Sequence, residues 1–144
     1  MEIQITCRHP KKNVDSATIK GNLPRILRDL GCHDGELSLV FTDDKEIAEL
    51  NYRFLERDGP TNVLAFPMRD GGPVGPDTPM LGDIVISLDA AERDAQRAGE
   101  TLERMTSRLL IHGLLHLFGY DHEGSEQQAQ RMDEETDRLL ALMQ

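Results

Sequence analysis

The feature that most constrains this chain is a histidine-rich stretch at residues 111–124, which reads IHGLLHLFGYDHEG. His112 and His116 are four residues apart, so a helix of about 3.6 residues per turn puts both imidazoles on one face. Gly119 predicts the left-handed residue that ends such a helix, and the turn after it would carry His122 towards the pair. Three neutral imidazoles that converge in this way suit one zinc ion, at about 2.0–2.1 Å per nitrogen, with a fourth position left for water.

The spacing H-x-x-x-H-x-x-G-x-x-H is also the ligand skeleton of the metzincin peptidases, which carry Glu directly after the first histidine as general base. Here that residue is Gly113, so the stretch predicts a bound metal more strongly than it predicts peptide cleavage. The alternative is that each histidine simply packs in the protein. The leucine-rich surroundings predict a buried helix, however, and buried histidines need polar partners.

The predicted site is catalytic rather than structural, because structural zinc normally has four protein ligands, often cysteines, and neither Cys7 nor Cys32 lies near the motif. Three histidines also suit nickel or iron, so the pattern leaves the identity of the metal open. Asp121, beside the third histidine, is a candidate to orient a ligand imidazole or to relay a proton from the bound water. The alternative is an acid that only shapes the turn.

The segment HGLLHLFGYDH resembles the signature of the YbeY family of bacterial endoribonucleases, also described as ribosomal RNA maturation factors. DGPTNVLAFP at residues 58–67 and LGDIVIS at residues 81–87 are similar to that family's other motifs, in the same order. The resemblance implies a zinc-dependent, single-strand-specific endoribonuclease acting in small-subunit ribosomal RNA processing and ribosome quality control. It also implies ribosomal or ribosome-assembly proteins as partners, and neither DNA nor a membrane.

One position departs from the family pattern. Many relatives have Arg at the place of Leu55, and Arg57 is then the candidate for the phosphate contact. Two other functions stay open at this point. One is a metallohydrolase of another class, such as a peptidase or amidase, and the other is a non-catalytic ribosome-assembly factor with a structural metal.

The net charge of −10 does not by itself suggest a nucleic-acid enzyme, because phosphate contacts need Lys and Arg. The charge is uneven: residues 1–31 carry a net +3, and residues 32–144 a net −13. The N-terminus lacks a secretory signal, no apolar run reaches the roughly 18 residues of a membrane helix, and the two cysteines lie outside any CxxC motif. We therefore expect a cytoplasmic protein with free thiols.

Hydrophobic periodicity predicts a single α+β domain over residues 1–144, with helices packed on one small mixed sheet of about four strands. The predicted strands are 2–7, 36–42, 61–68 (an edge strand, because it contains Pro67) and 82–87. The predicted helices are 13–31 (one piece, or two because of Gly21 and Pro24), a helix opened by a capping box at Asp43, one capped by Ser87 or Asp89 that runs to about residue 98, one capped by Thr101 that carries the histidines, and 125–143. Residues 69–79, rich in Gly and Pro, are expected to form a loop.

Overall fold

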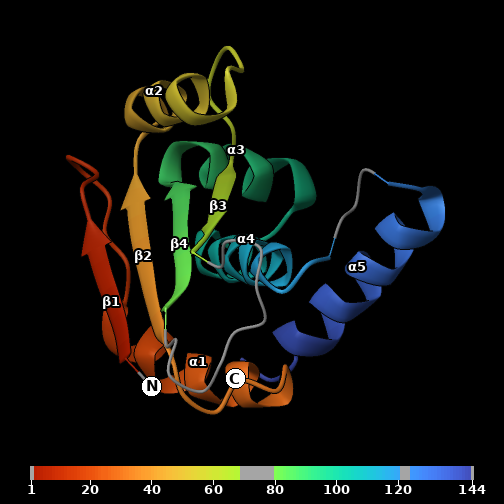
Figure 1. Ribbon diagram of the computed structural model, residues 1–144. Coiled ribbons are helices and arrows are strands. Elements are labelled where there is room, and N and C mark those ends of the chain that lie inside the picture. Colours follow the sequence, from red (N-terminus) through yellow and green to blue (C-terminus); the bar gives the residue numbers. More distant parts are fainter. Residues whose placement is uncertain (1, 69–79, 121–123, 144) are drawn as a thin grey trace.

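The computed structural model describes residues 2–68, 80–120 and 124–143 of the chain (Figure 1). The predicted loop at 69–79 lies outside the described residues. A four-stranded sheet forms the centre of the fold, with the strand order β1-β2-β4-β3. The strands are β1 (Glu2–Cys7), β2 (Glu36–Thr42), β3 (Val63–Pro67) and β4 (Met80–Ser87).

The sheet is mixed, as the sequence predicted. β1, β2 and β4 are parallel, while β3 pairs antiparallel with β4 and forms one edge. Pro67 is the last residue of this edge strand, a position where its missing N–H costs the ladder little. The predicted α+β class is therefore confirmed.

The two faces of the sheet are covered unequally. One face carries alternate residues of β2 and β4, including Leu39, Phe41 and Ile84, which are at most 1% exposed and join the main core with α1, α3, α4 and α5. The other face has a small cluster under α2, built on Ile47, Leu64 and Val85. In Figure 1, α4 lies beside the sheet with α5 beyond it, and α2 lies above the strands.

The helices begin at capping residues, as the sequence indicated for most of them. Each cap accepts, through its side-chain oxygen, a hydrogen bond from the backbone N–H three residues on, which satisfies one free donor of the first turn. The helices are α1 (Ser16–Asp29), α2 (Asp44–Leu55), α3 (Leu88–Ala98), α4 (Leu102–Leu117) and α5 (Glu126–Leu140), and their caps are Asp15, Asp43, Ser87, Thr101 and Ser125.

The structure decides one open point and differs from the prediction in other details. α1 is one continuous helix that contains Pro24, which is one of the two predicted forms. α5 ends at Leu140, three residues before the predicted end. The capping box of α2 is half formed, because Glu46 bonds the Thr42 hydroxyl and not the cap's own backbone. None of the helices in the described ranges has the length and apolar composition of a membrane span.

Candidate active site

The centre of the candidate site is the pair of histidines on α4. The helix buries an apolar stripe against the sheet and α5, while His112 and His116 stay half-buried at its margin. Their ring centroids are 4.9 Å apart, and the ring planes meet at 73°. Two imidazoles that share a tetrahedral zinc ion at about 2.0–2.1 Å per nitrogen have centroids about 5 Å apart. The pair therefore fits two ligands of one metal ion.

The turn after α4 has the predicted form. Gly119 adopts a left-handed conformation with φ of +94°, and its N–H donates to the carbonyl of His116 at 3.0 Å. Tyr120 then donates its N–H to the carbonyl of Leu115 at 2.9 Å, which reverses the chain direction. The next residues, including Asp121 and the predicted third ligand His122, lie outside the described residues. Within the described ranges no three His, Cys, Asp or Glu side chains come close enough to share a metal.

Gly113 explains why this motif lacks the metzincin base. A Cβ atom at this position would lie 2.9 Å from Cγ2 of Ile84 and 3.3 Å from Cγ2 of Val63. The position directly after the first histidine thus faces the sheet at close contact, because α4 packs on β3 and β4 there. A glutamate at Gly113 would enter the apolar core, so a proton acceptor must come from another element.

A small cavity of about 110 Å³ lies beside the first histidine, between α4, α5 and the start of β3. Its lining residues are Asn62, Arg108, Leu109, His112, Asp133 and Thr136. Asn62 is oriented by its amide, which donates to the Asp94 carboxylate at 3.1 Å. Arg108 contributes a guanidinium group, and its Nη1 lies 3.0 Å from Oδ1 of Asp137. The cavity therefore combines a metal-ligand candidate with a cation and a carboxylate.

Sequence reasoning missed Arg108. The signal that could have found it is its position four residues before His112, which puts both side chains on one face of α4. The predicted phosphate contact, Arg57, is exposed just after α2 and is not among the residues that line this cavity. Leu55, at the position where many relatives have Arg, is 44% exposed.

A second polar cluster lies at the carboxyl ends of the parallel strands and was also missed. Nδ1 of His9 accepts hydrogen bonds from the backbone N–H groups of Lys11 and Lys12, so its ring proton is on Nε2 and is donated to Asp89 at 2.8 Å. Asp89 also accepts from the Lys12 ammonium and from the N–H of Asp44. Burial alone would raise the pKa of the Asp89 carboxyl, but these hydrogen bonds outweigh it and hold that pKa well below its ordinary value.

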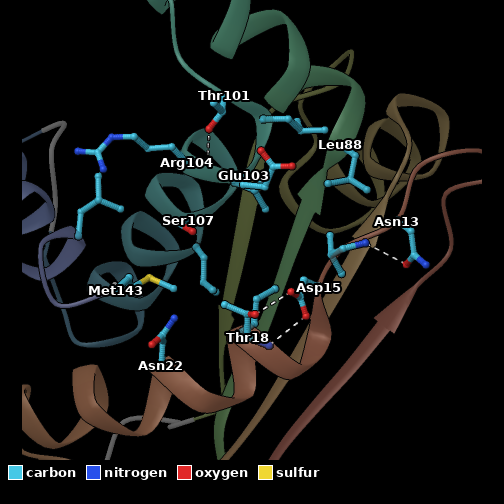
Figure 2. Close-up of a pocket in the computed structure, with 16 residues that line it drawn as sticks. Asn13, Asp15, Thr18, Asn22, Leu88, Thr101, Glu103, Arg104, Ser107 and Met143 are labelled. Carbon is cyan, nitrogen blue, oxygen red and sulfur yellow. Dashed lines mark hydrogen bonds between the residues drawn. The ribbon is translucent and has the colours of Figure 1, made fainter.

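A cavity of about 400 Å³ opens elsewhere, between α1 and the first half of α4 (Figure 2). Thr18 and Asn22 of α1 and Ser107 of α4 line it, together with Met143 near the C-terminus. Neither histidine of the pair lines this cavity. It is therefore separate from the candidate metal centre.

The fold and the site define a class of protein: an α+β domain in which a helix against a mixed sheet carries a histidine pair one turn apart and ends at a left-handed glycine. The chain belongs to the endoribonuclease YbeY family, whose sequence profile matches residues 4–144. The family resemblance noted in the sequence is thus confirmed.

Individual relatives agree with this membership. The endoribonuclease YbeY of Syntrophotalea carbinolica is 44% identical over 140 residues, which cover 96% of this chain and 93% of the relative. The endoribonuclease YbeY of Aquifex aeolicus is 44% identical over 133 residues, covering 91% and 85%. The solution structure of TM1509 from Thermotoga maritima superposes with a TM-score of 0.67 at 27% identity, over 98% of this chain and 88% of that one.

Proposed function

We propose that this protein is a metal-dependent endoribonuclease that cleaves single-stranded RNA during ribosomal RNA maturation and ribosome quality control. As a family member it is a hydrolase of RNA phosphodiester bonds, and RNA is its substrate. The observation that supports metal dependence is the 4.9 Å separation of the His112 and His116 rings. We treat residues 1–144 as one hydrolase domain.

The residues have distinct proposed roles. His112 and His116, with His122, would hold one zinc ion per chain. When bound, such an ion supplies a Lewis acid and lowers the pKa of a coordinated water towards about 7. Arg108 is positioned to contact a phosphate group beside the pair, since it lines the same cavity as His112. Asp121 is proposed to orient a ligand imidazole or to accept a proton, and Arg57 to make a more distant phosphate contact.

The packing at Gly113 argues against the peptidase alternative, because the position that carries the base in metzincins is filled by the side chains of the sheet. We propose ribosomal or ribosome-assembly proteins as partners, because a chain of net charge −10 gains little from long-range attraction to RNA. Binding to DNA or to a membrane is not expected, and the proposed location is the cytoplasm.

The test compares purified wild type with a His112→Ala, His116→Ala double variant on single-stranded RNA, with a protein substrate in parallel. Metal content is measured on each sample. His33→Ala is the matched control, because it removes an exposed histidine far from the motif in sequence. We expect wild type and control to bind metal and cleave RNA, while the double variant does neither and keeps its circular dichroism spectrum.

Other results would lead to a different functional assignment. Equal cleavage by all three proteins would mean a contaminating nuclease. Metal-loaded wild type that leaves RNA intact would favour the assembly factor with a structural metal, and cleavage of the protein substrate would favour another hydrolase class.

A further inference from the structure

A cluster of exposed apolar side chains lies at the end of α2 and beside the edge strand. Tyr52, Phe54 and Leu55 are 64%, 58% and 44% exposed, and Met68, just after β3, is 53% exposed. These four are the large apolar side chains that are exposed in the described part of the chain. Scattered exposed apolar residues need no explanation, whereas a concentration in one place marks an interaction site.

The cluster has a fixed aromatic centre. The Phe54 ring packs on Phe66 of β3, with centroids 5.4 Å apart and planes tilted by 59°. Phe66 in turn packs against the small core under α2 that contains Leu64 and Val85. The Phe54 ring is therefore held against the sheet by Phe66, while the residue is 58% exposed. A ring held in this way loses little conformational entropy when a flat group stacks on it.

Two arginines lie at this end of α2. Cζ of Arg53 lies 5.7 Å from the centroid of the Phe54 ring, and Arg57 follows one turn later on the exposed chain. Neither arginine makes an ion pair within the described residues. Six other arginines do pair with carboxylates: Arg8, Arg93, Arg97, Arg104, Arg108 and Arg138. The positive charge at the end of α2 is thus left available, on a protein whose net charge is −10.

We infer that the exposed Phe54 ring, with the Arg53 guanidinium over it and Arg57 just after the helix, is a stacking platform for unpaired bases of the RNA substrate. Aromatic rings and planar guanidinium groups stack on any base, and arginines contact the adjoining phosphates. The unpaired arginines favour RNA over a purely apolar protein partner. This inference rests on the proposed endoribonuclease function and names a surface through which that site would engage single-stranded substrate.

The platform and the candidate site adjoin the same edge strand, β3, from its two faces. The exposed segment after α2 leads to Asn62, which lines the cavity beside His112. α4 packs on one face of β3 at Val63, and Phe54 packs on the opposite face at Phe66. A single strand of RNA that leaves the histidine pair would pass the edge of β3 to reach the platform.

The test measures the affinity for a fluorescently labelled single-stranded RNA, on ice and with a gel to verify that the RNA stays intact. A Phe54→Ala variant removes the ring, and a Phe54→Leu variant keeps apolar bulk without an aromatic face. Loss of one stacked base weakens binding by roughly 5- to 150-fold. We expect both variants to bind single strands at least fivefold more weakly, with binding to a fully paired duplex unchanged.

A further measurement addresses the arginine directly. Arg53→Gln should weaken single-strand binding and reduce its salt dependence, whereas Lys45→Gln, an equal charge change at the exposed start of the same helix, should do neither.

The outcomes separate this inference from the proposed function. Wild-type affinity in the leucine variant would show a plain apolar contact and overturn the stacking role. Wild-type affinity in every variant, with RNA cleavage intact, would overturn the platform and leave the endoribonuclease standing. Loss of self-association or of binding to a protein partner, with RNA affinity unchanged, would identify a protein interface instead. Wild type that neither binds nor cleaves RNA would overturn both proposals.

Discussion

Replacing Gly113 by alanine tests how closely α4 packs on the sheet beneath the histidine pair. The added Cβ would lie 2.9 Å from Cγ2 of Ile84, about 0.6 Å inside the ordinary carbon–carbon range of about 3.5–4.0 Å. Ile84 is fully buried and β-branched, so its Cγ2 atom cannot move aside by a simple rotation. The helix must therefore shift away from β4.

The expected magnitude follows from two opposing terms. Glycine to alanine within a helix gains about 0.8–1.0 kcal/mol of intrinsic propensity. Overpacking a core by one methyl group costs about 1–3 kcal/mol. We expect Gly113→Ala to be destabilised by about 1 kcal/mol net.

Gly21→Ala is the matched control, because Gly21 also lies within a helix but an added Cβ there meets no atom within 4 Å. This variant should be stabilised by about 0.5–1 kcal/mol. The difference between the two variants isolates the packing strain at Gly113, about 1–3 kcal/mol. Urea unfolding followed by circular dichroism gives both free energies. Equal stabilisation of the two variants would refute the close contact between α4 and β4.

Three further predictions follow from other contacts. Arg108→Gln should slow RNA cleavage and raise KM, whereas Asp137→Asn, which frees the same guanidinium from its 3.0 Å ion pair, should leave cleavage at or above the wild-type rate. Equal losses in the two variants would mean that the ion pair only ties α4 to α5. The stability that the Asp89 carboxylate contributes should be complete above its unfolded pKa of about 3.9, and should be lost as the pH falls from there through its lower folded pKa. Asp89→Asn should therefore lose less stability than wild type between pH 7 and about 3, as measured by urea unfolding. A steeper loss in the variant would contradict this sign. Arg138→Gln, at an ion pair whose side chains are 47% and 32% exposed, should cost about 1 kcal/mol or less, whereas the adjacent Leu139→Ala, fully buried, should cost about 2–5 kcal/mol. Comparable losses in these two variants would be inconsistent with their burial.

Most of the architecture could be read from local patterns in the sequence. Alternation in β2 marks Leu37, Leu39 and Phe41 as one buried face, and the structure confirms each as at most 1% exposed. Cap residues such as Thr101 were visible because short polar side chains compete for the free N–H groups of a first turn. The sequence did not decide whether α1 continues through Pro24, because the surroundings of this residue determine whether the lost hydrogen bond matters.

The sequence by itself determined that His112 and His116 share a helix face, because helical geometry is local and repeats every few residues. It also determined that the turn begins at a glycine, because a left-handed conformation is strained for most other residues. Contacts between segments distant in the chain were decided by the tertiary structure alone. These include Arg108 with Asp137 across α4 and α5, Phe54 on Phe66, and the atoms of Ile84 that leave no room beside Gly113. Such contacts depend on how whole helices and strands pack, and no local pattern of residues encodes the distance between two segments far apart in the chain.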